Sequence, residues 1–306
     1  MARARIGNSR LTIKAVHCLT AICLAVPASA SEQPGQATEL WDAARKGGRF
    51  AAPTRDELRT AEDLFRGTLT DNGDEEKLKK AWTKARFEVL VEGQGDNQIW
   101  VIREQPDHKE GRGFYLIRRG KTPAIALQAP HGWNDLHTGP IAIALFREGK
   151  VRAAALNTVD RLDADLAHRD GTHFQAFTRA FAVEYPRGLI IQLHGFEAKK
   201  RKTEGAKEAG IIVSNGTKQP PEWLLDFAGR LKMDVEDVKV FPRDVRELGG
   251  TTNAQAKLLV ELKHDGFAHL EIGLALRKQL RYMRAQRESF LNAVSATYDA
   301  ARKLPN

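Results

Sequence analysis

From residue 124 to the C-terminus, short apolar runs alternate with longer segments of helical periodicity. The strand-like runs cover residues 124–128, 151–157, 189–193, 210–213, 238–241 and 267–272. The helical segments cover residues 140–146, 170–184, 221–232 and 253–262, and a long last helix is expected over residues 274–303. Because strand–helix–strand units cover both faces of a sheet, this order predicts a three-layer α/β fold. We expect a mostly parallel or mixed sheet with helices on both faces.

Three segments precede this region. Residues 1–30 have the pattern of a signal peptide, with four basic residues, a short apolar run and a small-residue cleavage motif that ends at Ala30. An uncleaved anchor is the alternative, although the apolar run is short for a membrane span. Residues 31–86 are polar and helical, with Thr54 and Asp74 as expected N-caps, and form a predicted N-terminal extension. Residues 87–306 form the predicted main domain, which begins with a meander of three strands.

The predicted leader changes what the composition implies. Both cysteines, Cys18 and Cys23, lie in it, so a transition metal in the mature chain would need His, Asp or Glu ligands. Removing the four basic leader residues lowers the formal net charge from +9 to +5, and no aromatic-basic motif for nucleic acid occurs. We therefore expect a periplasmic or secreted protein with no nucleic-acid partner and no stable membrane association after cleavage.

Polar side chains gather where the predicted strands end. His131 and Asp135 follow the first strand of the α/β region, and His194 follows the third. Ligands of open α/β sheets bind at the carboxyl ends of strands, and three protein ligands with an open fourth position describe a catalytic zinc site. We expect one zinc ion per chain. His137 is the alternative to Asp135 as third ligand, and manganese or cobalt are the alternatives to zinc.

Two further strand-end groups have the chemistry of a substrate site. Asn157 and Arg161 follow the second strand, where such a pair could hold a carboxylate or polarise a carbonyl. Thr252 and Asn253 end a glycine-bearing loop before a predicted helix, and we expect them to line the substrate pocket.

Glu271 ends an otherwise apolar strand, where a carboxylate is costly unless it is functional or paired. Arg277 is the partner that a purely structural role would require. His269 shares a strand face with Glu271, so it could orient the carboxylate or bind metal itself. Together these groups contain the parts of metal-assisted hydrolysis, with a carboxylate to accept a proton from water.

The ordered motifs APHGWNDLHTG, LNTVDR, IIQLHGF and AHLEIGLALR resemble the zinc-dependent exopeptidase fold. This fold is shared by carboxypeptidases, N-formylglutamate amidohydrolases and poly-γ-glutamate hydrolases, and the resemblance covers about residues 124–280. It implies that the zinc ligands are His131, Asp135 and His194, that Glu271 is the general base, and that Arg161 with Asn157 binds a substrate carboxylate or the oxyanion. The sequence departs from the carboxypeptidase pattern at Asp135, since that pattern has a glutamate three residues after the first histidine.

Two functional classes remain open. The preferred hypothesis is a zinc-dependent amidohydrolase or carboxypeptidase-like peptidase, acting on a peptide, an N-acyl amino acid or a γ-glutamyl-type substrate that carries a carboxylate. The alternative is a non-catalytic periplasmic binding or accessory protein on the same fold. A serine hydrolase is disfavoured because the sequence has no G-x-S-x-G motif.

Overall fold

The computed structural model describes residues 1–2, 36–71, 74–95 and 98–301. The predicted signal peptide therefore lies outside the described residues, apart from its first two positions. From residue 36 onward, the described chain belongs to one unit. No helix in the described ranges is both long enough and apolar enough to cross a membrane.

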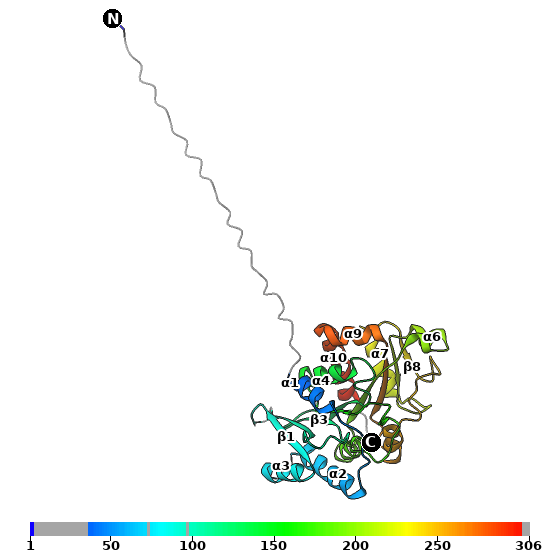
Figure 1. The fold of residues 1–306 in the computed structure, drawn as a ribbon. Helices are drawn as coiled ribbons and strands as arrows, with labels where there is room; N and C mark the ends of the chain where they lie inside the picture. The colour runs from blue at the N-terminus through cyan, green and yellow to red at the C-terminus, as the bar shows by residue number, and fades with distance from the viewer. Residues whose placement is uncertain (3–35, 72–73, 96–97, 302–306) are drawn as a thin grey trace. The chain divides into compact units, whose positions relative to one another are not determined.

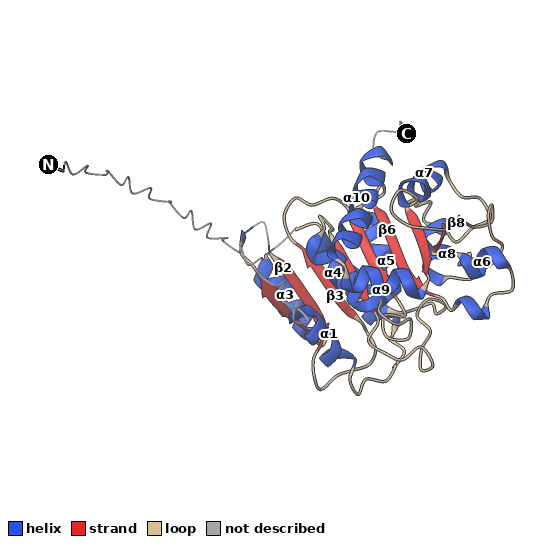
Figure 2. Cartoon of the chain, turned by 90° about the horizontal axis from the view of Figure 1, so that it is seen from above, coloured by secondary structure: helices blue, strands red, loops and turns tan. Residues whose placement is uncertain are grey.

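A sheet of nine strands forms the middle layer (Figures 1 and 2). Its strands are β1 (Phe87–Glu92), β2 (Ile99–Glu104), β3 (Phe114–Arg118), β4 (Ile125–Ala129), β5 (Ala153–Leu156), β6 (Leu189–Gly195), β7 (Ile211–Ser214), β8 (Val238–Val240) and β9 (Phe267–Ile272). Their spatial order is β1-β2-β3-β5-β4-β6-β9-β7-β8.

The sheet is mixed, which is one of the two arrangements that the sequence predicts. Its centre, β5-β4-β6-β9, is parallel. The meander β1-β2-β3 joins β5 in antiparallel pairing, and β7 pairs antiparallel with β9 while it runs parallel to β8. Every residue of β4 and β5 is buried, which explains why these strands appear in the sequence as continuous apolar runs.

Helices complete the outer layers. They are α1 (Gln36–Arg45), α2 (Arg55–Leu69), α3 (Glu75–Lys84), α4 (Thr138–Glu148), α5 (His173–Glu184), the 3-10 helix η2 (Ala198–Lys200), α6 (Glu204–Glu208), α7 (Glu222–Leu231), α8 (Ala254–Glu261), α9 (Leu274–Tyr282) and α10 (Arg284–Ala301). The chain moves from β4 to β5 in one direction and from β5 to β6 in the other. Right-handed crossovers therefore place α4 and α5 on opposite faces of the sheet.

Side-chain caps mark where several of the helices begin. Thr54 caps α2 with the predicted capping box, in which Glu57 accepts the Thr54 backbone N–H, and Asp74 caps α3. The single long last helix was predicted wrongly, because α9 and α10 are separated at Met283, whose backbone is extended. The Arg287 guanidinium stabilises this break by donating to the carbonyl oxygens of Leu280 and Arg281 at the end of α9.

An aromatic cluster packs the N-terminal helices against the sheet. The ring of Phe65 on α2 lies 4.9 Å from Trp82 on α3, 4.6 Å from Tyr115 on β3 and 5.3 Å from Phe177 on α5, measured between ring centroids. All four side chains are fully buried. Edge-on aromatic pairs of this kind add to the stabilisation from burial, so α2 and α3 share one hydrophobic core with the sheet.

The topology creates a crevice at one place in the sheet. The segment that follows β4 crosses to β5 on one side, whereas β6 lies on the other side of β4. The carboxyl ends of β4 and β6 are therefore neighbours from which the chain departs in different directions, which is where ligands bind in open α/β sheets.

Candidate metal centre

The loop after β4 brings His131 and Asp135 together. The Asp135 backbone N–H donates to the His131 carbonyl at 2.9 Å, so these residues close one helix-like turn. Residues four apart in such a turn lie on the same side, and the His131 Nδ1 is 3.4 Å from Asp135 Oδ2. Both side chains are buried.

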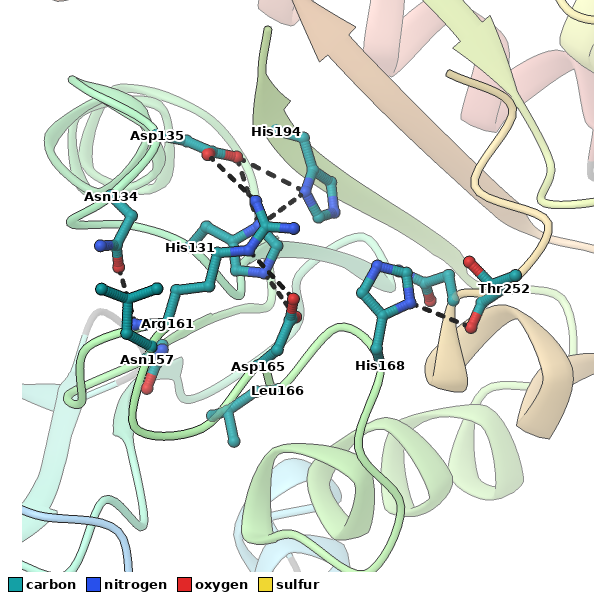
Figure 3. A network of polar contacts seen from close by, with 12 residues as sticks. His131, Asn134, Asp135, Asn157, Arg161, Asp165, Leu166, His168, His194 and Thr252 are labelled. Carbon is teal, nitrogen blue, oxygen red and sulfur yellow. Dashed lines mark hydrogen bonds and ion pairs between the residues drawn. The ribbon is translucent and has the colours of Figure 1, made fainter. Parts of the chain in front are cut away.

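His194 reaches the same point from β6. Its Nδ1 lies 3.2 Å from the His131 Nδ1 and 3.6 Å from Asp135 Oδ2. The Gly195 backbone N–H donates to Asp135 Oδ2 at 2.9 Å, which ties the β4 loop to the end of β6. Figure 3 shows the three side chains converging.

These three atoms have the spacing of a tetrahedral zinc site. Ligands at zinc–nitrogen distances of roughly 2.0–2.1 Å lie about 3.3 Å apart along the edges of a tetrahedron. The three separations here, 3.2, 3.4 and 3.6 Å, match that edge. The donor set of two imidazoles and one carboxylate also suits zinc, so the described residues fit the metal expected from the sequence.

The outer nitrogens of both imidazoles have partners. His131 Nε2 is 2.8 Å from Asp165 Oδ1, and His194 Nε2 is 2.8 Å from Gln192 Oε1. A carboxylate can only accept, so His131 Nε2 carries hydrogen, and when the ring is neutral its Nδ1 has a lone pair that faces the centre. Metal-binding histidines usually have such an outer partner, which fixes the ring and its tautomer.

Charge in the centre follows from this packing. Burial opposes ionisation of Asp135, but the adjacent imidazoles of His131 and His194 outweigh it and hold the Asp135 pKa well below its usual range. Burial lowers the pKa of His194 to about 4. For His131, burial is outweighed by the hydrogen bonds with Asp135 and Asp165, and its pKa is raised. A carboxylate thus faces two buried rings, an arrangement that a cation stabilises.

Glu271 lies beside this centre. On the parallel strands β6 and β9, it is the register partner of His194. Its side chain is 13% exposed, and His269 Nε2 lies 4.0 Å from its Oε1. Burial, with the nearby Asp135 charge, raises the Glu271 pKa to about 8. The carboxyl group can therefore hold and release a proton near neutral pH.

The structural partner considered for Glu271 is engaged elsewhere. Arg277 donates to the backbone carbonyls of Ile272, Leu136 and Phe196. No ion pair or hydrogen bond joins it to Glu271 among the described residues. One carboxylate oxygen of Glu271 and a ring nitrogen of His194 lie within 4.8 Å of each other, so Glu271 lies beside the candidate metal centre.

Arg161 lies at the outer edge of the site. Its Nε donates to Asp165 Oδ2 at 3.0 Å, its Nη1 is 4.0 Å from Asp135 Oδ1, and 42% of its side chain is exposed. Figure 3 shows the Arg161 side chain next to Asp135 and Asp165. Because part of this side chain is exposed, a ligand in solvent can reach it.

The other predicted substrate residues have different surroundings. The Asn157 side chain is turned into its own loop, where it donates to the Val159 carbonyl and accepts the Val159 N–H. Asn253 is buried and caps α8. Thr252 is exposed, and its carbonyl oxygen lies 3.2 Å from the His168 Nδ1. The structure therefore brings Arg161 to the centre, but it gives the two asparagines hydrogen bonds within the protein.

His137, the alternative third ligand, lies outside the group of potential metal ligands that contains His131 and His194. Its backbone is left-handed, with φ of 80°, and its ring packs against Tyr282 with 5.6 Å between centroids. The geometry favours Asp135.

Trp41 on α1 supports the loop that carries His131 and Asp135. Its Nε1 donates to the Asn157 carbonyl at 2.9 Å, and its ring covers Gly132 in the loop and Gly139 at the start of α4. A Cβ on Gly139 would lie 2.4 Å from the Trp41 ring, and the Gly139 N–H donates to the Gly132 carbonyl. The glycines are therefore required for close packing, and the predicted N-terminal extension contributes a residue next to the site.

A groove of about 1050 Å³ borders the centre on one side. Asp135 and Gly195 belong to its lining, and its other walls include the start of α9 and the loop after β6. His131, His194 and Glu271 do not line it, so it is adjacent to the candidate chemistry and does not contain it.

Sequence reasoning missed two partners of the candidate ligands, Asp165 and Gln192. Gln192 could have been found, because it interrupts an apolar strand and shares a face with His194 by the period of two. Asp165 had a weaker signal, its position four residues after Arg161.

Comparisons with known proteins find similarity in structure alone. No protein-family model matches the sequence, and no curated protein sequence matches it. The chain is similar to a gene product of Agrobacterium tumefaciens (TM-score 0.43, 10% identity), covering 59% of this chain and 89% of that one. It is also similar to an aspartoacylase family protein from Mesorhizobium loti (TM-score 0.37, 15% identity, 68% and 66% covered). A candidate carboxypeptidase from Burkholderia mallei is a third such structure (TM-score 0.39, 11% identity, 74% and 68% covered).

Proposed function

We propose that this chain is a secreted zinc-dependent hydrolase that cleaves an amide bond. The observation that carries the proposal is the convergence of His131 Nδ1, His194 Nδ1 and Asp135 Oδ2 at zinc-ligand spacing next to the buried carboxyl group of Glu271. Export is proposed from the leader pattern of residues 1–30.

Each part of the centre has a role in this reaction. A zinc ion bound by His131, Asp135 and His194 would polarise the amide carbonyl and lower the pKa of an attacking water. Glu271 accepts a proton from that water and delivers it to the departing amide nitrogen. Its buried position next to His194 suits this exchange, since a carboxyl group screened from bulk water is not held permanently ionised.

Arg161 supports a substrate that carries a carboxylate. Its guanidinium is anchored through Nε to Asp165, its Nη1 lies 4.0 Å from Asp135 Oδ1, and 42% of the side chain is exposed. A planar guanidinium binds a carboxylate through two parallel hydrogen bonds. We therefore propose a peptide, an N-acyl amino acid or a γ-glutamyl-type compound as substrate.

Metal content tests the proposal. Elemental mass spectrometry on protein purified without chelator should find about one zinc per chain, as expected for a three-ligand catalytic site. The double variant His131→Ala, His194→Ala should lose the zinc while circular dichroism stays unchanged. A wild-type protein that binds no zinc even after zinc is added would exclude the hydrolase.

Turnover separates the hydrolase from a binding protein on the same fold. Dipeptides, N-acyl amino acids and γ-glutamyl peptides would be incubated with the zinc-loaded protein, and products identified by mass spectrometry. Glu271→Gln should keep zinc and lose roughly 10²–10⁴-fold in rate, the usual contribution of a general base. Binding of these compounds without hydrolysis by either protein would favour the binding protein.

A further inference from the structure

A chain of buried side chains lies directly behind the metal centre. Its members are each at most 1% exposed. They come from β4, α5, β6, the cap of α8 and α8 itself, and they are Gln128, Thr178, Gln192, Asn253 and Gln255. Buried polar groups are costly unless their hydrogen bonds are complete, so the direction of every bond in this chain is constrained.

One end of the chain is anchored at a backbone carbonyl. The Gln255 side chain donates through Nε2 to the Leu166 carbonyl oxygen at 3.0 Å, and a carbonyl can only accept. The other half of that amide, Oε1, must therefore face Gln192, where it accepts from Gln192 Nε2 at 3.2 Å.

A second anchor gives the same orientation independently. The Ala256 backbone N–H donates to Asn253 Oδ1 at 3.0 Å, and an N–H can only donate. Asn253 must therefore present its NH2 group to Gln192, and Nδ2 donates to Gln192 Oε1 at 2.6 Å. If the Gln192 amide were reversed, its oxygen would face Gln255 Oε1 and its nitrogen would face Asn253 Nδ2, so neither hydrogen bond could form.

The orientation of Gln192 determines the tautomer of His194. Gln192 Oε1 lies 2.8 Å from His194 Nε2 and can only accept. His194 Nε2 must therefore carry the hydrogen, and Nδ1 has the lone pair. Nδ1 is the atom that lies 3.2 Å from His131 Nδ1 and 3.6 Å from Asp135 Oδ2.

We propose that Gln192 is a positioning residue, held by Gln255 and Asn253, that keeps His194 as the Nε2–H tautomer with its Nδ1 lone pair ready for a cation. The proposal rests on the proposed function only in naming zinc as that cation. Asp165 orients His131 in the same sense through a carboxylate, whereas His194 is oriented by a neutral amide. If a carboxylate replaced the Gln192 amide, its oxygen would face the side-chain oxygens of Gln128 and Gln255, and the two hydrogen bonds that Gln192 Nε2 donates would be lost.

Two matched variants test this role. Gln192→Met removes the acceptor from His194 Nε2 in a side chain of similar size. Gln128→Met makes the same change at the register partner of Gln192 on β4, where the amide touches Gln192 and Thr178 but not His194. Zinc dissociation constants would be measured by competition with a chromophoric chelator, and folding by circular dichroism.

Gln192→Met should weaken zinc binding about 10–100-fold, as removal of a metal ligand's outer partner does. Gln128→Met should change it by less than about threefold, since Gln192 retains Gln255 and Asn253. If the two variants weakened zinc binding equally, the buried amides would serve only packing, and the proposal would be overturned.

Asn253→Asp provides a second variant that keeps the helix cap, because an aspartate oxygen can still accept the Ala256 N–H. It replaces the donor to Gln192 by an acceptor, so zinc binding should weaken although α8 stays intact. Unchanged zinc affinity in this folded variant would contradict the proposed orientation.

The tautomer itself is measured without metal, which separates this inference from the proposed function. Long-range ¹H–¹⁵N spectra of zinc-free protein should show His194 as the Nε2–H tautomer, and a mixture of tautomers in Gln192→Met. If the wild-type protein bound no zinc but showed this tautomer, the proposed hydrolase function would be rejected and the role of Gln192 in orienting His194 would be supported. An Nδ1–H tautomer in the wild type would overturn the inference whatever the zinc content.

Discussion

His131 Nδ1 lies 3.2 Å from His194 Nδ1, although the two residues are 63 positions apart in the chain. The contact exists because β4 and β6 are neighbours in the sheet and both end at the same crevice. Asp135 joins them through a single turn and is tied to β6 by the Gly195 N–H. Contacts within the protein therefore hold the three candidate ligands together.

The choice between Asp135 and His137 as third ligand leads to a first prediction. Asp135→Asn keeps an oxygen for the Gly195 N–H but removes the charge, so zinc should bind more weakly and raise the melting temperature less. Ligand binding stabilises the folded state by about 2.7 kcal/mol at 100 times the dissociation constant. His137→Ala should leave this zinc-dependent shift intact. Differential scanning calorimetry with and without zinc measures both, and a shift lost only in His137→Ala would reverse the assignment.

Arg161 should affect substrate affinity more than metal binding. Arg161→Met removes the guanidinium and should raise KM about 10–100-fold for a substrate with a free carboxylate, because a charge-assisted hydrogen-bonded pair contributes roughly 1.5–3 kcal/mol. Zinc content should not change, since Arg161 is not a ligand. The control is the same substrate with its carboxylate converted to an amide. An equal loss on both substrates would argue against carboxylate recognition.

Asn157 should affect stability instead. Its side chain makes two hydrogen bonds to Val159 in a buried turn, and leaving such groups unpaired costs about 1–3 kcal/mol each. Asn157→Ala should therefore lower the free energy of unfolding by that order, as measured by urea denaturation, while KM changes little. A normal stability with a raised KM would restore the substrate-binding role expected from the sequence.

The raised pKa of Glu104 predicts that the stability of the protein depends on pH. Burial raises its pKa from 4.5 to about 7, although backbone N–H groups of Glu110 and Arg112 partly offset this. Below pH 4.5 the group is protonated in both states and its stabilising contribution is fully present. As pH rises toward 7 the unfolded chain releases the proton first, so stability falls and the contribution, on the order of 3 kcal/mol, is lost above the folded pKa.

Glu104→Gln should remove that loss. Other titrating groups are common to both proteins, so the difference between their urea-denaturation free energies from pH 4.5 to 7.5 isolates Glu104. The wild type should lose stability relative to the variant across this window. Parallel curves would show that Glu104 does not titrate with a raised pKa.

The fold class was predicted from sequence and is confirmed. The apolar runs and helical periodicities after residue 124 arise from burial, which depends on each residue's own side chain, so they can be recognised locally. Strand-end positions also directed attention to His131, Asp135, His194 and Glu271, since carboxyl ends of parallel strands meet at one edge. The end of α9 was missed because Arg287, which stabilises it, belongs to the next helix.

What the sequence determined, then, is the alternation of strands and helices and the types of side chain at the strand ends. The tertiary structure decided which of those side chains meet, that Asp135 and not His137 faces the histidines, and that Asn157 and Asn253 bond within the protein. It also decided the tautomer of His194, through Gln192 and Gln255. The physical reason is that hydrogen bonds between distant segments depend on directions and distances in space, for which a linear sequence has no periodic signal.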